Sequence, residues 1–140
     1  TESHAEVING SGEYLPFSSG TFDVVISHNV LDHVMSPTSV LSEIYRVLRN
    51  NGALFLSVNV FEINTVFRRI ADYLDRPHPH HFTSNDVYQL VSETGFDVSN
   101  EYTRSIHGSS FKGHIAHYLF NSKRYGVHAL KTVPVSSSSN

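Results

Sequence analysis

The sequence predicts an α/β fold built around a parallel β-sheet. Phe22 to Ser27 (FDVVIS) is a short, nearly unbroken apolar run rich in β-branched residues, which is typical of a parallel strand buried on both faces. The apolar residues that recur next at helical spacing predict an amphipathic helix, and they are Val40, Leu41, Ile44, Val47 and Leu48. Gly52 is suited to the left-handed turn that ends a helix, and Ala53 to Val58 (ALFLSV) predicts a second buried strand.

The elements around this strand-helix-strand unit are predicted from residues that typically begin or end helices and strands. Glu6 to Asn9 is expected to form a short strand, and Pro16 to Gly20 a loop. Ser36 followed by Pro37 combines an N-cap hydroxyl with proline at the first helical position, so the helix should begin there.

Two further helices are predicted after the second buried strand. The first spans Ile63 to Leu74 and stops at Arg76-Pro77. The second begins at Thr83, where Asp86 three residues later completes a capping box, and it ends at Gly95. Val87, Leu90 and Val91 form its apolar face.

Two strands are expected at the end of the chain, with a Ser-rich tail after them. They are Phe96 to Thr103 and His114 to Asn121, joined by the polar segment from Arg104 to Gly113. Residues 1–128 are therefore taken as one domain, and residues 129–140 as a disordered tail.

Composition limits the function classes. The 140 residues allow one domain, and the 39% hydrophobic content suits a soluble globular core. The chain has no cysteine, which excludes disulfides and thiol catalysis and favours the cytoplasm. A net charge of −3 argues against a nucleic-acid partner. No apolar run is long enough to cross a bilayer, so no membrane span is expected.

Several motifs together resemble the class I, Rossmann-like S-adenosylmethionine-dependent methyltransferases of the type 11 kind. The motifs are LPF at residues 15–17, FDVVIS at 22–27, VLDHV at 30–34, LSEIYRVL at 41–48 and the glycine at 52. The resemblance extends from about Val7 to Asn121. It implies a seven-stranded sheet in the order 3-2-1-4-5-7-6, with strand seven antiparallel. This chain would then hold a partial Rossmann-like methyltransferase sheet, strands three to seven, with flanking helices.

The glycine-rich cofactor loop of that family is missing from the sequence. Gly10-Ser11-Gly12 does not supply it, because Leu15 stands three residues after Gly12 and Pro16 forbids the helix that should follow. The segment instead resembles the family's later GDAxxLPF-like loop, so the chain looks like the carboxyl-terminal part of a methyltransferase domain. Without strands one and two, FDVVIS becomes an apolar edge that invites self-association.

The resemblance implies where S-adenosyl-L-methionine would bind. Ser11 and Gly12 match the positions that meet the adenine, although Ser11 stands where the family usually has Asp, which weakens the contact. The alternative for these two residues is a plain glycine turn. Ser27, His28 and Asn29 match the segment that borders the methionine part of the cofactor, and the alternative there is a strand end that tolerates polar residues.

His33 is the candidate catalytic base, with Asp32 beside it, since methyl transfer to a hydroxyl or carbon acid benefits from a base near neutral pH. A packing role for His33 is the alternative. Asp23 begins its strand away from the site and is interpreted as structural. Arg46 and Arg49 lie near a helix end, where they favour the helix dipole, and are also interpreted as structural.

The remaining histidines are interpreted as substrate-side or solvent-exposed residues. His80 and His81 fall in a PHPHHFT run that resembles a segment shaping the substrate side in the family, and exposure to solvent is the alternative. His114 and His117 would point to opposite faces of a strand, which argues against one metal holding both. No metal site is therefore predicted, and a histidine-based metallohydrolase is the weaker third interpretation.

Two functions follow from different classes. The first is S-adenosylmethionine-dependent methyl transfer to an unidentified small-molecule acceptor, competent only in the full-length protein, with these residues alone inactive. The second is a non-catalytic interaction or scaffold module that keeps the methyltransferase-like core. The missing glycine-rich loop is the feature that separates the two.

Overall fold

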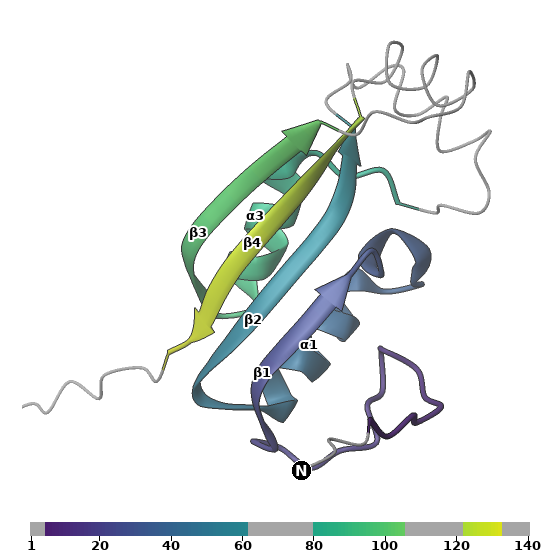
Figure 1. Cartoon of the computed structure of the whole chain (residues 1–140), viewed down its shortest axis with the longest axis vertical. Coiled ribbons are helices and arrows are strands. Elements are labelled where there is room, and N and C mark those ends of the chain that lie inside the picture. Colours follow the sequence, from purple (N-terminus) through teal and green to yellow (C-terminus); the bar gives the residue numbers. More distant parts are fainter. Residues whose placement is uncertain (1–4, 62–79, 106–121, 133–140) are drawn as a thin grey trace, which may run out of the picture.

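The computed structural model describes residues 5–61, 80–105 and 122–132. The strands in these ranges form one four-stranded sheet, and Figure 1 shows α-helices against it. The elements in chain order are β1 (Phe22–His28), the 3-10 helix η1 (Leu31–His33), α1 (Pro37–Val47), β2 (Leu48–Phe61), α3 (Ser84–Glu93), β3 (Phe96–Ser105) and β4 (Ser122–Lys131).

The sheet has the order β1-β2-β4-β3. β1 and β2 are parallel, whereas β4 is antiparallel to both of its neighbours. This is the arrangement expected for strands four, five, seven and six of the seven-stranded sheet, so the predicted α/β fold with a partial Rossmann-like sheet is confirmed. β1 is central in that arrangement, but it lies at an edge of the described sheet.

The core of the described residues lies on one face of the sheet. In Figure 1, α1 and α3 both lie behind the strands, and among the described residues no helix covers the front. Alternate side chains of β2 point to the helices and are almost fully buried: Leu54, Leu56, Val58 and Val60. The intervening Phe55 is 44% exposed on the other side. We call the uncovered side the open face.

β1 has the same two-sided pattern. Val24 is 49% exposed and Ile26 is 74% exposed, whereas Ser27 is 6% exposed. The prediction that this strand is buried on both faces is therefore wrong for the described residues, because only the α1 side is covered.

Helix α1 begins as predicted. The Ser36 hydroxyl accepts a hydrogen bond from the Ser39 N–H, and Pro37 occupies the first helical position. Its end differs from the prediction, because the left-handed conformation belongs to Asn51 (φ 64°) rather than to Gly52. A Cβ at position 52 would lie 2.8 Å from the Arg49 carbonyl oxygen, so Gly52 is required by close backbone packing.

Helix α3 also begins and ends as predicted. The Thr83 hydroxyl accepts from the Asp86 N–H at 3.2 Å, and the Asp86 carboxylate accepts from the Thr83 N–H at 2.9 Å. This is the complete capping box. Gly95 follows the helix with a φ of 104° and turns the chain into β3.

Some predicted boundaries need correction. Glu6 to Asn9 is not a strand, and its residues are exposed. β3 continues to Ser105, so Arg104 belongs to a strand rather than to a loop. The predicted helix from Ile63 to Leu74 and the predicted strand from His114 to Asn121 lie outside the described residues.

The last strand runs to Lys131, three residues into the segment assigned to the tail. The Lys131 ammonium donates to the carbonyl oxygens of Tyr45 and Leu48 at 2.8 and 2.9 Å. These bonds tie the end of β4 to the end of α1, where a cation also complements the helix dipole. The division into a domain and a tail otherwise remains a prediction.

Candidate functional site

The predicted methionine-side segment lies at the carboxyl end of β1. Ser27 is buried, and the next two residues are held by Ser57 of β2. The His28 Nδ1 and Ser57 Oγ atoms are hydrogen-bonded at 2.5 Å, and the Asn29 N–H donates to the Ser57 carbonyl oxygen at 2.7 Å. Asn29 has a φ of 56°, so the chain turns sharply here in a conformation that asparagine tolerates. Ser57 therefore fixes the shape of this turn.

Two buried acceptor oxygens follow in the same turn. Among the described residues, Asn29 Oδ1 and Asp32 Oδ1 are buried and have no hydrogen-bond partner. Asp32 as a whole is 1% exposed. Since an unsatisfied buried acceptor costs free energy, each favours an N–H or O–H donor in its surroundings.

The candidate base His33 lies beside this pair. Its side chain is 42% exposed, and its Nε2 lies 3.7 Å from Asp32 Oδ2. The predicted base is therefore accessible and has a buried carboxylate next to it. Its catalytic role remains a prediction.

The predicted adenine-side residues form a tight turn. The Ser11 hydroxyl accepts from the Glu13 N–H at 3.2 Å, and its carbonyl oxygen accepts from the Tyr14 N–H at 3.1 Å. A Cβ at Gly12 would lie 3.5 Å from Val40 Cγ2, which is an ordinary contact with α1. This geometry agrees with the plain glycine turn, and it leaves the cofactor role of Ser11 and Gly12 untested.

A charged pair on α1 holds the loop that follows. The Glu43 carboxylate accepts from the Leu15 N–H at 2.8 Å. The Arg46 guanidinium donates to the Leu15 and Phe17 carbonyl oxygens at 3.1 and 2.8 Å. We call Glu43 and Arg46 with these backbone partners the loop clasp. It fixes the LPF segment, and with it the Ser11 turn, against α1.

The clasp carries the clearest electrostatic perturbation among the described carboxylates. Arg46 Nε lies 2.7 Å from Glu43 Oε1. Hydrogen bonds from Arg46 and from the Leu15 N–H lower the pKa of Glu43 from 4.5 to about 2. The same pair raises the pKa of Arg46. Arg46 was predicted to act through the helix dipole, and its contacts show a second role that the Glu-x-x-Arg spacing in EIYR could have indicated.

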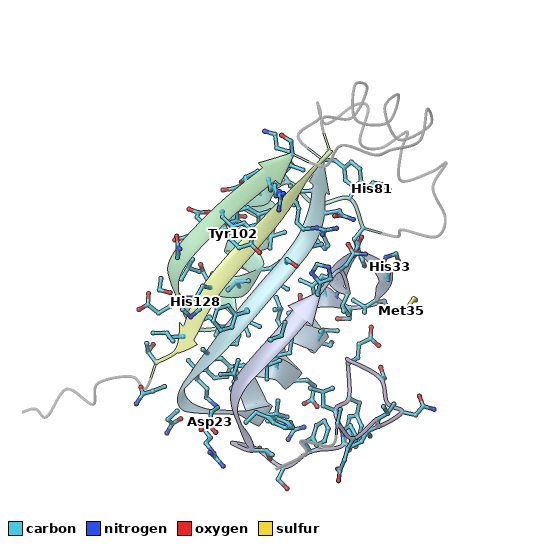
Figure 2. The ribbon with its side chains drawn as sticks, in the orientation of Figure 1. Asp23, His33, Met35, His81, Tyr102 and His128 are labelled. Carbon is cyan, nitrogen blue, oxygen red and sulfur yellow. The ribbon has the colours of Figure 1, made fainter. Side chains whose placement is uncertain are left out.

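Asp23 and Arg49 lie at the opposite end of β1. They form an ion pair on the surface, in which Arg49 Nη1 donates to Asp23 Oδ1 at 2.7 Å and to Asp23 Oδ2 at 2.8 Å. Figure 2 shows Asp23 near the lower end of β1 and His33 beyond the tip of this strand. The position of Asp23 away from the polar turn is as predicted.

The two histidines predicted to border the substrate, His80 and His81, lie close to the carboxyl end of β2. The chain there pairs with β2 through the Phe61 N–H, which donates to the Phe82 carbonyl oxygen at 2.8 Å. His81 is 8% exposed, with its ring 5.2 Å from that of Phe61, so the alternative of solvent exposure does not hold for it. His80 stacks on Phe82 at 5.6 Å, and its Nε2 is buried without a partner among the described residues.

The two parallel strands thus carry polar turns at the same edge. Figure 2 places His33 and His81 beyond the ends of β1 and β2.

The remaining predicted histidines are not placed, because His78, His114 and His117 lie outside the described residues. Within residues 5–61, 80–105 and 122–132, no three His, Asp or Glu side chains gather as metal ligands would. In the same ranges, no helix is long and apolar enough to cross a membrane.

The strand order and the polar carboxyl edge define a Rossmann-like methyltransferase fold. Residues 1–56 match a family model described as "Methyltransferase domain". A protein of Mycobacterium sp. (strain KMS) called "Uncharacterized methyltransferase" is 41% identical over 54 residues, which are 39% of this chain and 21% of that protein. The chain therefore matches about a fifth of the length of this curated relative.

Solved structures extend the likeness in fold to most of the chain. A Bacillus halodurans C-125 protein classed provisionally as a methyltransferase has a TM-score of 0.74 at 19% identity, with 91% of this chain and 78% of that chain covered. Haemonchus contortus phosphoethanolamine N-methyltransferase 2, in complex with S-adenosyl-L-methionine, has a TM-score of 0.63 at 12% identity, with 88% and 36% covered. The [4+2]-cyclase SpnF has a TM-score of 0.68 at 14% identity, with 89% and 56% covered.

These matches confirm the resemblance to S-adenosylmethionine-dependent methyltransferases and the fold that goes with it. They also show that this fold occurs in a protein named for a cyclisation. The activity must therefore be argued from the site.

Proposed function

We propose that a protein containing these 140 residues transfers the methyl group of S-adenosyl-L-methionine to a small-molecule acceptor. The observation that carries this proposal is the turn from Ser27 to Asn29 at the carboxyl end of a parallel strand. Ligands of open α/β sheets bind at this edge. The match of residues 1–56 to the methyltransferase model supports the same assignment.

The residues of this chain could contact the methionine and adenine parts of S-adenosyl-L-methionine. The Ser27–Asn29 turn offers backbone groups and the buried Asn29 Oδ1 acceptor to the methionine part. The Ser11 turn offers a hydroxyl and backbone groups to the adenine. The sequence contains neither a glycine-rich loop after a first strand nor the acidic residue that follows the second strand of the resembled family and holds the ribose. We therefore propose that activity requires the full-length protein, with those parts supplied by residues outside this sequence.

The chain's own residues would prepare the acceptor. S-adenosyl-L-methionine supplies a methyl group on a good leaving group, so the protein mainly aligns the acceptor and excludes water. His33 would take the proton from an acceptor hydroxyl or carbon acid. Its partly exposed imidazole and its position after β1 support this role. His80 and His81 would border the acceptor, since both lie at the neighbouring strand end.

A scaffold module is the second candidate. The observation in its favour is the open face, where Phe55 and Tyr102 are 44% and 55% exposed in the described structure. An apolar surface of this kind can serve protein association without catalysis. Cofactor binding distinguishes the two candidates.

The test is a thermal melt with and without excess S-adenosylhomocysteine. A longer protein that includes a glycine-rich loop should be stabilised, by about 2.7 kcal/mol when the ligand exceeds its dissociation constant about a hundredfold. The 140-residue chain should show no shift, because it supplies only one side of the site. Asn29→Gly in the longer protein should reduce this ligand-induced stabilisation. The matched control is Asn51→Gly, because Asn51 is also left-handed but lies near the start of β2, away from the carboxyl ends of the parallel strands.

Each result has a definite meaning. No shift in the longer protein would contradict the methyltransferase and favour the scaffold. A shift in the 140-residue chain would contradict the requirement for further residues. Equal shifts in both asparagine variants would remove Asn29 from the cofactor site.

A further inference from the structure

A row of polar side chains crosses the open face near the carboxyl ends of β2 and β3. Arg124 of β4 lies directly opposite Asn59 of β2 on one side and opposite Arg104 of β3 on the other. Tyr102, two residues before Arg104, lies on the face turned toward the viewer in Figure 2, and residues two apart in a strand share a face. We call Asn59, Arg124 and Arg104 the arginine row.

The two arginines of this row are cross-strand neighbours. Directly opposed side chains on one face of an antiparallel pair have Cβ atoms about 4.5–5.5 Å apart, and like charges in such positions repel each other. Among the described residues, the ion pairs join other side chains and include neither Arg104 nor Arg124. The row therefore brings two positive charges together, and within the described ranges no carboxylate is paired with either of them.

Arg124 also has a buried donor atom that lacks an acceptor. Its Nε is buried without a hydrogen-bond partner among the described residues, while its Nη2 lies 3.5 Å from Asn59 Oδ1. A buried donor without an acceptor costs free energy, and the cost is larger when the group is charged. An anion bound to this guanidinium would accept the missing hydrogen bond and offset the repulsion between the two arginines.

The nearest acidic residue of β3 serves the other face of the sheet. Glu101, three residues before Arg104, accepts a hydrogen bond from the hydroxyl of Tyr125, whose side chain belongs to the buried core. The sequence that joins β3 to β4, residues 106–121, contains neither aspartate nor glutamate. This connecting sequence therefore offers no carboxylate side chain to balance Arg104 and Arg124.

We propose that the arginine row binds an anionic group of the methyl acceptor, a carboxylate or a phosphate. The inference rests on the proposed methyl transfer and adds a substrate class to it, a small organic anion. Guanidinium groups bind carboxylates and phosphates through paired hydrogen bonds, which fix the orientation of the bound molecule as well as neutralise its charge.

The row lies within reach of the polar turn at the end of β1. His28 lies opposite Ser57, and Asn59 follows Ser57 by two residues on β2. With strands about 4.8 Å apart and a rise of about 3.3 Å per residue, the Arg124 backbone lies about 10 Å across the sheet and about 7 Å along it from His28. A small molecule can therefore have its anionic group at the row and its reacting atom near the Ser27–Asn29 turn.

Inorganic phosphate is the probe for the arginine row. Thermal melts of the longer protein are compared in phosphate and in chloride, at equal pH and ionic strength. Phosphate should stabilise the unmodified protein, because a ligand of the folded state shifts the unfolding equilibrium. Arg124→Gln should raise the dissociation constant of phosphate at least about tenfold, since it removes a charge-assisted hydrogen bond.

Arg49→Gln is the matched control for the loss of a guanidinium. Arg49 lies on the surface, paired with Asp23 near the start of β1 and away from the row. This variant should keep the full stabilisation by phosphate. The general effect of phosphate on protein stability is the same in both variants, so the difference between them reports the row.

Arg104→Gln gives a second measurement, which decides the matter if Arg124→Gln fails to fold. Arg104 is exposed, so its replacement should leave the fold intact. In chloride the variant should be more stable than the unmodified protein, because it removes the repulsion between opposed like charges. In phosphate the order should reverse, since the bound anion loses one of its two guanidinium partners.

A carboxylate supplied by residues outside this sequence is the alternative partner for the row. Phosphate would then find the place filled, and equal phosphate effects in the unmodified protein and in all three variants would overturn the proposal. S-adenosylhomocysteine in the same melts tests the proposed function separately, and it should stabilise all four proteins alike. Failure of S-adenosylhomocysteine alone would contradict methyl transfer, whereas failure of phosphate alone would contradict only the anionic acceptor.

Discussion

Asn29 and Asn51 show how much depends on single residues in this fold. Both have positive φ, at 56° and 64°; Asn29 directly follows β1, and Asn51 lies near the start of β2. Asparagine tolerates this conformation better than other non-glycine residues. Asn51 takes the left-handed conformation near the start of β2, and the next residue, Gly52, passes close to the Arg49 and Asp23 carbonyl oxygens. The sequence shows that a glycine is needed here, but the reason becomes visible only when the two strands are paired.

Glu43 gives a prediction for the pH dependence of stability. Its pKa is lowered from 4.5 in the unfolded chain to about 2 in the folded protein, mainly by the hydrogen bond from Arg46. Its contribution to stability is therefore complete above pH 4.5 and is lost as the pH falls toward 2. Glu43→Gln should destabilise the protein at neutral pH, and this difference from the unmodified protein should shrink between pH 4.5 and 2. Urea unfolding at several pH values measures it.

The control for Glu43→Gln is Asp97→Asn, which changes an exposed carboxyl on β3. It should leave the free energy of unfolding within about 0.5 kcal/mol of the unmodified protein at neutral pH. A Glu43→Gln difference that stays constant down to pH 2 would show that the clasp does not perturb this carboxyl.

At the scale of elements, the strands and helices with local signals could be predicted. β1, α1 and α3 follow from an apolar run or from caps that involve residues close in sequence. β4 was missed, although Tyr125, Val127 and Ala129 alternate with Gly126 and His128 as in a half-buried strand. It is a strand because it lies between β2 and β3, with its alternate side chains on the core. The sequence analysis instead predicts the last strand in the more apolar segment from His114 to Asn121.

The candidate site also has parts with a local sequence signal and parts that depend on the pairing of distant residues. The polar residues from Ser27 to Asn29 could be predicted, since they come at the end of an apolar run. The role of Ser57 could not, because it depends on the register that places His28 opposite Ser57. The loop clasp joins residues 28 to 31 positions apart, so only its Glu43–Arg46 half has a local signal.

Helix α3 offers a direct test of the predicted capping box. Thr83→Ala removes the hydroxyl that accepts from the Asp86 N–H, and it should lower the free energy of unfolding by about 1 kcal/mol. Thr83→Ser retains an acceptor and should lose much less. Thr38→Ala, an exposed threonine inside α1, is the control for the change in side chain. A loss with Thr83→Ser as large as that with Thr83→Ala would show that the cap bond contributes little. Urea unfolding measures all three variants.

At the scale of the whole molecule, the described sheet has one buried and one open face. The buried face holds a single apolar cluster contributed by α1, α3 and three strands. Tyr102 and His128 lie on the face turned toward the viewer in Figure 2. The open face is partly covered by its own aromatic side chains: Phe55 stacks on His128 with ring centres 4.3 Å apart, and Tyr102 lies over Gly126. These contacts shield part of the surface that no described helix covers.

Two neighbouring residues on β2 test this division of the sheet. Leu54 is fully buried against the helices, whereas Phe55 points to the open face. Leu54→Ala should cost about 2–5 kcal/mol, because it leaves a cavity in the only apolar cluster of the described residues. Phe55→Ala should cost about 0.5–1.5 kcal/mol, since it removes mainly the stacking on His128. Domains of this size are stable by only about 5–15 kcal/mol, so the leucine variant should approach unfolding at room temperature while the phenylalanine variant stays folded. Equal losses in urea titrations would mean that the open face is buried in solution and would contradict the one-sided core.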